Sequence, residues 1–509
     1  VNMNGTAKEA AALVAFFNGS VDDNRTIGTD IWGRNWGTVG DWARLRRDNG
    51  NPEPLNIKLW EVGNEFYGGN QGSGKDCTAW GWENVWTCDG TEYAHGIGSG
   101  TSRRQGYLEF REAMRAVDST IQVGAVGVAY RSEWSNWGNE VVAAAGDVMD
   151  FYTIHHYAYF QQPASYADAL AQPQQTWSSI MADAQAAFDI HAGGREVPIA
   201  VTEHNLFSVQ EQDNNQWMTR AVNALFMADT IGQMQQHGVA MANQWDLANG
   251  TAANGTDYGL MKEDGFARNP QYYVFPLWER FGDAMLPVTF SRSAETTLSV
   301  YAGYIDDQTL SLLAINKTGS SLDTTIAIDG VAAINGGTVD VVSATSLGSQ
   351  SVTFNGVADP SDDLANAPGA ALPGSEVPFS FSFAPYSITL LRMSTSDVVP
   401  TAAPTQPVPE MPVTPTATAM PTATPGSTPD GEAVVYSDAL AAGWNNWSWN
   451  TSADFATTSP RQSGSAAMAV THDTAWAGFY LHTDAPPAVD AYDTLRFWVH
   501  GGSTGGQQV

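Results

Sequence analysis

The stretch Ile57–Glu65, with the sequence Ile-Lys-Leu-Trp-Glu-Val-Gly-Asn-Glu, decides the fold of this chain. It predicts a buried strand that stops at a carboxylate and then turns polar. A second run, Val197–Glu203, has the sequence Val-Pro-Ile-Ala-Val-Thr-Glu and stops in the same way. Because an unpaired buried carboxylate is costly, two of them at strand ends indicate groups that are either paired or used.

Helices and strands alternate around these two runs up to about residue 250. The predicted helices are Ala7–Phe17, Arg104–Val117, Glu133–Ala145, Thr176–His191 and Trp217–His237. The other predicted strands are Val1–Asn4, Val123–Val128, Met149–His156 and Val239–Trp245. This order predicts an α/β fold of the (β/α)8 TIM-barrel type, in which parallel strands point their carboxyl ends to one face.

Glu65 and Glu203 would then meet at the carboxyl ends of parallel barrel strands. Two carboxyl groups about 5–5.5 Å apart are the acid/base and the nucleophile of a retaining glycosidase. The acid must keep its proton near neutral pH, so its pKa must be raised by burial or by the other carboxylate. The alternative is that both are ordinary ion-paired glutamates.

Three strand-end motifs resemble glycoside hydrolase family 51, over roughly residues 1–395. They are Trp60–Glu65, ending Gly-Asn-Glu; Tyr152–Tyr157, with two histidines before the last tyrosine; and Val201–Asn205, Val-Thr-Glu-His-Asn. That family contains α-L-arabinofuranosidases and some endo-glucanases and xylanases. The resemblance implies a barrel with the acid/base, Glu65, on strand 4 and the nucleophile, Glu203, on strand 7.

The resemblance also implies substrate contacts. Asn64 would bond the sugar hydroxyl next to the anomeric carbon, His155 would touch the acid or the sugar, and Tyr157 would donate to the nucleophile. Trp245, at the end of strand 8, could stack beneath the sugar. Asp246 stands where arabinofuranosidases of the family usually have glutamine, so the exact sugar stays open. His155 could instead be a satisfied core histidine.

The segment 66–100 is long for a loop between a strand and a helix. It follows the acid/base directly and carries Trp80, Trp82 and Trp86, which we expect to line subsites for a polysaccharide, although aromatic residues of such loops also serve as packing. It also holds the two cysteines of the chain, Cys77 and Cys88. In an oxidising compartment they could form a disulfide, the alternative being two free thiols.

Composition narrows the class of partner. The chain has 509 residues and a formal net charge of −31, which argues against nucleic acid and anionic membranes and suits a neutral polymer. No apolar stretch is long enough to span a membrane. No motif implies a metal or an organic cofactor. We therefore expect an extracellular, secreted bacterial protein whose partner is plant cell-wall polysaccharide or oligosaccharide.

The pattern changes after about residue 284. Short alternating strands such as Thr297–Ala302 and Leu310–Ile315 predict a β-sandwich over 284–395. Residues 396–431 are rich in Pro, Thr and Ala and predict an extended linker. Residues 432–509, with several tryptophans, predict a partial carbohydrate-binding-like β-module, or a structural module whose tryptophans are core.

The chain begins at Val1, beside a predicted strand end that we number strand 3. We therefore expect 1–283 to be a barrel domain without strands 1 and 2 and without the sugar-pocket residues that the family carries there. The leading function is an α-L-arabinofuranosidase. The alternatives are an endo-β-1,4-glucanase or xylanase on the same scaffold, and a non-catalytic carbohydrate-binding protein.

Overall fold

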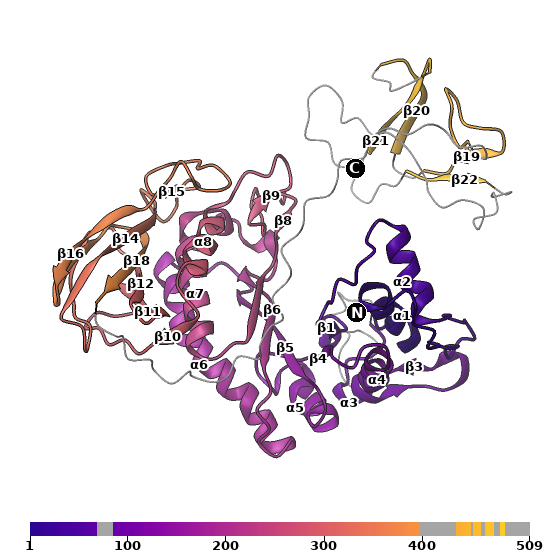
Figure 1. The fold of residues 1–509 in the computed structure, drawn as a ribbon, viewed down its shortest axis with the longest axis horizontal. Coiled ribbons are helices and arrows are strands. Elements are labelled where there is room, and N and C mark those ends of the chain that lie inside the picture. Colours follow the sequence, from indigo (N-terminus) through magenta and orange to yellow (C-terminus); the bar gives the residue numbers. More distant parts are fainter. Residues whose placement is uncertain (69–84, 397–433, 449–450, 460–463, 473–478, 484–509) are drawn as a thin grey trace. The chain divides into compact units, whose positions relative to one another are not determined.

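The computed structural model describes residues 1–68, 85–396, 434–448, 451–459, 464–472 and 479–483. The chain divides into two compact units, Val1–Pro412 and Val413–Val509. The first unit is built around a five-stranded sheet with the strand order β1-β4-β5-β6-β7, all neighbours parallel (Figure 1). Its strands are β1 (Leu59–Val62), β4 (Gln122–Val126), β5 (Phe151–Tyr159), β6 (Ile199–Phe207) and β7 (Met241–Gln244).

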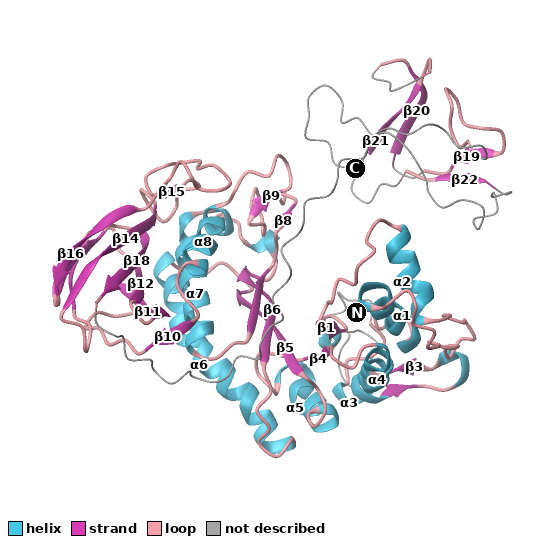
Figure 2. Ribbon diagram, viewed as in Figure 1, coloured by secondary structure: helices cyan, strands magenta, loops and turns pink. Residues whose placement is uncertain are grey.

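A helix connects each strand of this sheet to the next, as parallel pairing requires (Figure 2). The helices of the first unit are α1 (Ala7–Asn18), α2 (Val39–Asp48), α3 (Gly90–His95), α4 (Tyr107–Val117), α5 (Glu133–Ala145), α6 (Tyr166–His191), α7 (Ala221–Gln236) and α8 (Phe275–Glu279). The first residues of the strands face one shared apolar hollow, lined by Leu59, Gln122, Phe151, Pro198, Ala200, Ala240 and Met241. The sheet is therefore curled like part of a barrel.

The alternation of strands and helices is confirmed, but several bounds differ from those that the sequence predicts. Helix α6 begins at Tyr166, ten residues before the predicted start at Thr176, because Ser165 caps it and Pro173 is accommodated inside it. Strand β1 has four residues, since the backbone leaves the sheet at Gly63, whose φ is +96°. A positive φ is readily adopted only by glycine.

The prediction of a strand at Val1–Asn4 is wrong, because these residues do not form a strand. The segment nevertheless lies beside β1. The ammonium group of Val1 donates to the carbonyl of Glu61 at 2.6 Å, and Gly63 N donates to the carbonyl of Val1 at 2.9 Å. Two bonds are too few for a strand, but they put these residues where a strand preceding β1 would pair.

Strands continue after α8 in a second layer. One sheet has the order β10-β11-β12-β18-β14-β15, with β16 also paired to β14, and a separate ladder joins β13 to β17. The strands are β10 (Ala284–Leu286), β11 (Leu298–Asp306), β12 (Thr309–Asn316), β13 (Leu322–Ile326), β14 (Ala333–Ser343), β15 (Thr353–Phe354), β16 (Ala370–Glu376), β17 (Phe379–Phe383) and β18 (Ser387–Thr395). These strands belong to the same compact unit as the parallel sheet.

The second unit is described in part. It contains two antiparallel ladders, one between β19 (Trp444–Asn446) and β22 (Leu481–Thr483) and one between β20 (Thr451–Thr457) and β21 (Ala467–His472). The predicted linker 396–431 lies outside the described residues, apart from residue 396. Among the helices that the structure describes, none is long and apolar enough to cross a bilayer.

A buried ion pair joins the antiparallel sheet to the helices of the parallel sheet. Lys317, just after β12, donates from Nζ to Asp229 Oδ2 on α7 at 2.7 Å and to the carbonyl of Leu170 on α6 at 2.7 Å. Tyr301 on β11 also donates to Asp229. Both charged side chains are fully enclosed. A buried pair is costly to break, since the remaining partner keeps its charge without compensation.

We expect Lys317→Met to lower the free energy of unfolding by about 3–5 kcal/mol, because Asp229 would stay buried and unpaired. Urea unfolding, followed by circular dichroism, measures the change. The matched control is Arg47→Met, which removes an exposed ion pair with Asp48 and should cost about 0–1 kcal/mol. Equal losses in the two variants would contradict the role of the buried pair.

Candidate active site

Glu65 is presented by a sharp turn rather than by the strand itself. After β1 the backbone turns at Gly63, and Glu65 adopts a left-handed conformation with φ of +40°. A single 3-10 turn, η1 (Phe66–Gly68), follows it. Left-handed backbone is uncommon for a residue with a side chain, and such residues gather at functional sites. The turn carries the carboxyl group to the carboxyl end of the sheet.

Glu203 and His155 come from the two neighbouring strands β6 and β5. The register pairs them directly, His155 opposite Glu203, after an irregularity between Ile154 and His155. Side chains at paired positions of adjacent strands lie on the same face of a sheet. The two strands therefore bring the imidazole beside the carboxyl group.

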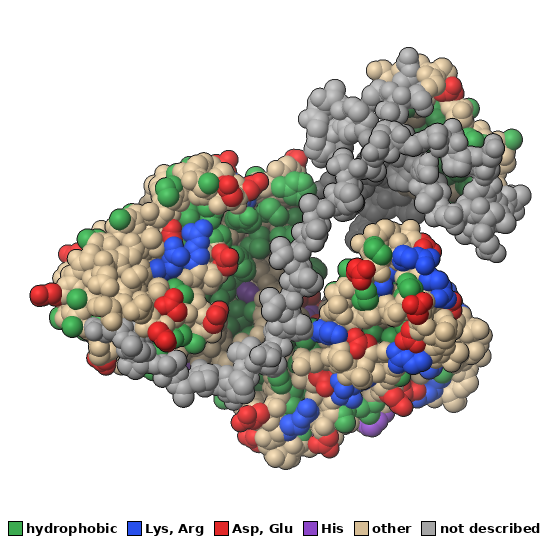
Figure 3. All heavy atoms as spheres, viewed as in Figure 1, with side chains coloured by type: hydrophobic (Ala, Val, Ile, Leu, Met, Phe, Trp, Pro, Cys, Tyr) green, Lys and Arg blue, Asp and Glu red, His purple; other side chains and the backbone are tan. Residues whose placement is uncertain are grey.

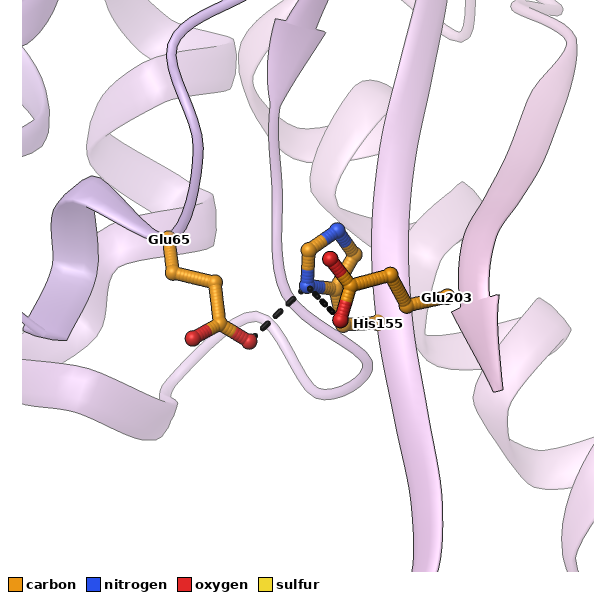
Figure 4. A group of neighbouring side chains, drawn as sticks. All are labelled: Glu65, His155 and Glu203. Atoms are coloured by element: carbon orange, nitrogen blue, oxygen red, sulfur yellow. Dashed lines mark hydrogen bonds and ion pairs between the residues drawn. The ribbon is translucent and has the colours of Figure 1, made fainter. Parts of the chain in front are cut away.

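These three side chains form one compact group (Figure 4). His155 Nδ1 lies 2.8 Å from Glu65 Oε1 and 3.5 Å from Glu203 Oε2. One ligating atom from each of the three residues lies within 4.8 Å of the others. The side chains are 18% (Glu65), 6% (His155) and 15% (Glu203) exposed. Two carboxyl groups thus share a largely enclosed space with one imidazole between them.

Donors from β5 hold the second carboxyl group. The hydroxyl of Tyr157 donates to Glu203 Oε2 at 2.7 Å. His155 Nδ1 faces two carboxyl oxygens, which accept, so the hydrogen of the ring is assigned to Nδ1. Deeper in the sheet, the hydroxyl of Thr153 donates to Glu61 Oε1 at 2.7 Å. Glu61 is therefore a supporting carboxyl group below the pair.

The environment shifts the pKa of both Glu203 and His155. Burial raises the pKa of Glu203, and the charge of Glu65 raises it further. The charge of His155 and the hydrogen bond from Tyr157 act in the opposite direction and lower this pKa. Burial alone would lower the pKa of His155. The hydrogen bond to Glu65 and the charges of Glu203, Glu65 and Glu61 outweigh burial, so that this pKa is raised. The protonated form of His155 is thus favoured by the acidic groups beside it.

Glu65, His155 and Glu203 also have the spacing at which side chains could hold a metal ion. The donor set does not fit that role in this arrangement. With the ring hydrogen assigned to Nδ1, the nitrogen of His155 that faces both carboxyl groups acts as a donor, whereas a ligating nitrogen must be without a hydrogen.

The remaining predicted residues lie at different depths. Asn64 is exposed directly before Glu65. Trp245 follows β7 and is 42% exposed. Burial and the nearby Asp257 raise the pKa of Asp246 to about 6. Trp245 and Asp246 thus stand at the carboxyl end of the strand next to the one that carries Glu203, where a substrate group could reach them.

Trp86, predicted to line a subsite, instead lies in the core. It is 8% exposed, packs edge-on against Phe66 with ring centroids 5.5 Å apart, and donates to the carbonyl of Met3 at 3.3 Å. An aromatic residue in a polar loop can line the rim of a site or pack in the core, and the sequence alone does not show how the loop packs. Trp80, Trp82 and Cys77 lie outside the described residues, so their predicted roles stay predictions. The disulfide between Cys77 and the buried Cys88 likewise stays a prediction.

Two tyrosines of the site were not predicted. The hydroxyl of Tyr67 donates to Glu65 Oε1 at 3.1 Å. Tyr258, in the segment after β8 (Ala248–Asn249), packs on Tyr157 with ring centroids 6.5 Å apart. The only available signal was position, since Tyr67 comes two residues after the acid. Tyr258 gave no sequence signal.

Hydrophobic side chains gather beside this end of the sheet. In the space-filling view they cover the flank formed by β8, β9 (Met261–Lys262) and α8 (Figure 3). The exposed apolar residues of this stretch include Leu247 and Phe266, in addition to Trp245.

Known proteins resemble this chain in fold and, over one segment, in sequence. No protein-family model matches it. Over 162 residues, 30% of this chain and 24% of the relative, it is 26% identical to the probable α-L-arabinofuranosidase C of Aspergillus clavatus. The chain thus matches about a quarter of the length of that curated relative.

Solved structures cover much more of the chain. An α-L-arabinofuranosidase from Thermotoga maritima, in complex with arabinose, has a TM-score of 0.54 and 20% identity over 77% of this chain and 74% of that chain. The family 51 enzyme from Thermotoga petrophila has a TM-score of 0.53 and 20% identity over the same shares, 77% and 74%. The family 51 enzyme from Bifidobacterium longum has a TM-score of 0.51 and 16% identity over 77% and 75%.

The chain has the fold of glycoside hydrolase family 51. The resemblance that the three strand-end motifs predicted is therefore confirmed. At these levels of identity the structural likeness establishes the fold, and the activity has to be argued from the geometry of the site. In this family 51 fold, the candidate site lies at the carboxyl ends of β1, β5, β6 and β7.

We expect Tyr157→Phe to raise the pKa of Glu203, because it removes a donor that stabilises the carboxylate. The measurement is a pH titration by ¹³C NMR of labelled glutamate carboxyl carbons, with Glu203→Gln to assign the signal. Tyr159→Phe is the matched control. It removes a hydroxyl from the same strand that donates to the carbonyl of Asp168 and not to Glu203. An unchanged Glu203 signal in Tyr157→Phe would contradict this account of the site.

Proposed function

We propose that this chain is the catalytic part of a retaining glycoside hydrolase, an α-L-arabinofuranosidase acting on plant cell-wall polysaccharide or oligosaccharide. One observation carries the proposal. Glu65 and Glu203 converge from two strand ends, with carboxyl oxygens within 4.8 Å across His155. Nearest oxygens this close support a retaining arrangement, in which the two carboxyl groups lie about 5–5.5 Å apart, over an inverting one, in which they lie about 6.5–9.5 Å apart to leave room for water.

In the first step, Glu203 attacks the anomeric carbon while Glu65 gives its proton to the departing oxygen. The bond to the leaving group breaks and a covalent glycosyl–enzyme ester forms. In the second step, Glu65, now a carboxylate, takes a proton from water, which attacks the same carbon and releases Glu203. The net charge on the pair of carboxyl groups stays constant through the cycle, which suits an enclosed site.

The neighbours of each carboxyl group support these roles. A nucleophile must be ionised, and Tyr157 donates to Glu203 at 2.7 Å, which favours its carboxylate. The imidazole of His155 bonds Glu65 at 2.8 Å and lies 3.5 Å from Glu203, so it can hold the two groups in place while their charges exchange. Asn64, Trp245 and Asp246 are proposed to contact the sugar.

We further propose that the five strands β1, β4, β5, β6 and β7 correspond to strands 4 to 8 of a (β/α)8 barrel. The barrel domain would span 1–283, the β-sandwich 284–395, the linker 396–431 and a carbohydrate-binding-like module 432–509. A linker of this composition and a net charge of −31 suit a secreted enzyme that acts on a neutral polymer.

Product analysis tests the activity. We expect a protein that contains this chain to release free arabinose from an aryl α-L-arabinofuranoside and from arabinoxylan, because an exo-acting enzyme removes one terminal sugar in each cleavage. Chromatography of the products measures this. If xylan or β-glucan instead yields oligosaccharides and no free arabinose is released, the endo-glycanase alternative is established. If none of the substrates is hydrolysed, the result favours a carbohydrate-binding protein.

Substitution of the two carboxyl groups tests the roles. Glu203→Ala should abolish turnover on all substrates while sugar binding persists. Glu65→Ala should slow unactivated substrates by about 10²–10⁴-fold and largely spare aryl substrates with good leaving groups, which need no proton. Steady-state kinetics on matched pairs of substrates measures both. Turnover near wild type in Glu203→Ala, or an equal loss on both kinds of substrate in Glu65→Ala, would contradict the assignment.

A further inference from the structure

One oxygen of Glu65 accepts two hydrogen bonds. His155 Nδ1 lies 2.8 Å from Glu65 Oε1, and the hydroxyl of Tyr67 donates to the same Oε1 at 3.1 Å. The second carboxyl oxygen of Glu65 points away from His155 (Figure 4). The two hydrogen bonds to Oε1 therefore mark this oxygen as an acceptor.

The position of the Tyr67 hydroxyl is fixed by packing. The ring is buried and lies against Trp134, with centroids 5.2 Å apart and an angle of 30°, and against Trp137, edge-on at 6.2 Å. Trp137 is itself fully buried and donates to the carbonyl of Val126 at 2.9 Å. A ring held by two tryptophans keeps its hydroxyl in one place, so the contact with Glu65 is preorganised.

A protonated carboxyl group has one carbonyl oxygen, which accepts, and one hydroxyl oxygen, which donates. Because Oε1 accepts from both Tyr67 and His155, Oε1 is the carbonyl end and the proton belongs on Oε2. We propose that Tyr67 is a positioning residue that, with His155, fixes the acid proton of Glu65 on Oε2 and so orients it for transfer to the leaving group. This inference rests on the proposed role of Glu65 as acid/base.

Charged and titratable groups face Glu65 from each neighbouring element. Glu203 from β6 is the second carboxyl group of the site, and the charge of Glu65 raises the pKa of Glu203, so the two groups repel when both are ionised. His155 from β5 and Tyr67 from η1 favour the carboxylate by donating to it. Tyr157 from β5 is a neutral neighbour whose own pKa is raised, by burial first and then by Glu203 and Glu65. Removal of the Tyr67 hydroxyl therefore takes away one of the donors to Glu65 Oε1 and leaves the contact with His155 in place.

The test is Tyr67→Phe, which keeps the ring between the two tryptophans and removes the donor. Its kcat/KM is measured against pH on an aryl α-L-arabinofuranoside with a good leaving group and on an alkyl α-L-arabinofuranoside with a poor one. We expect about a tenfold loss on the alkyl substrate, less than about a twofold loss on the aryl substrate, and an alkaline limb moved to higher pH. The limb moves upward because Glu65, with fewer donors, keeps its proton longer.

Tyr107→Phe is the matched control. The hydroxyl of Tyr107 is also buried and donates to the carbonyl of Val123 at 2.7 Å, away from Glu65. It should leave both the ratio of the two substrates and the alkaline limb as in the wild type. If Tyr67→Phe does not fold, Tyr67→Met serves as the second variant, because it keeps an apolar contact with the tryptophans and has no hydroxyl.

The inference is overturned if Tyr67→Phe keeps the wild-type ratio and limb, or changes them only as Tyr107→Phe does. A wild-type protein that hydrolyses neither substrate would overturn the proposed function. A ¹³C NMR titration of Glu65 separates the two failures without activity. A pKa of Glu65 that is higher in Tyr67→Phe than in the wild type supports the positioning contact, and an equal pKa overturns it.

Discussion

The hydrogen bond between His155 Nδ1 and Glu65 is the interaction on which the candidate site depends. Two carboxyl groups whose nearest oxygens lie within 4.8 Å in an enclosed space repel when both are ionised, and burial adds a further cost to each charge. The imidazole offsets both effects, since it lies between the carboxyl groups and its own pKa is raised there. The irregular register between Ile154 and His155 contributes to this arrangement because it sets His155 opposite Glu203. The backbone of β5 is thus adapted to the charges that it must hold together.

The sequence predicted those parts of the site that follow from strand ends. Glu65 and Glu203 each close an apolar run, and the carboxyl ends of parallel strands meet at one edge, so their approach was predictable. The contact from Tyr67 was not, because it depends on the left-handed conformation of Glu65 and on the turn that follows it. Trp86 shows the same limit: its neighbours Phe66 and Met3 become neighbours only after the chain has folded.

The prediction of helix bounds was limited by a different effect. The predicted start of α6 was Thr176, three residues after Pro173. In the structure the helix continues through that proline and starts at Tyr166, where Ser165 accepts a hydrogen bond from Asp168 N. Tertiary contacts outweigh local propensity here, since α6 lies against α7 and receives the Lys317 contact from the antiparallel sheet. Helices α6 and α7 follow β5 and β6, so the Lys317 contacts link the antiparallel sheet to the helices next to the strands that carry His155 and Glu203.

The place of Asp246 bears on which substrates the site could accept. Arabinofuranosidases of family 51 usually have glutamine at the position to which Asp246 was matched, and a glutamine amide offers one donor group and one acceptor. A carboxylate offers acceptors alone, whereas a protonated carboxyl group offers a donor and an acceptor. Burial and Asp257 raise the pKa of Asp246 to about 6, so mildly acidic solution protonates it. The change from glutamine to aspartate therefore alters the hydrogen bonding of the site least below about pH 6, and most at neutral pH, where a sugar hydroxyl facing Asp246 must act as the donor.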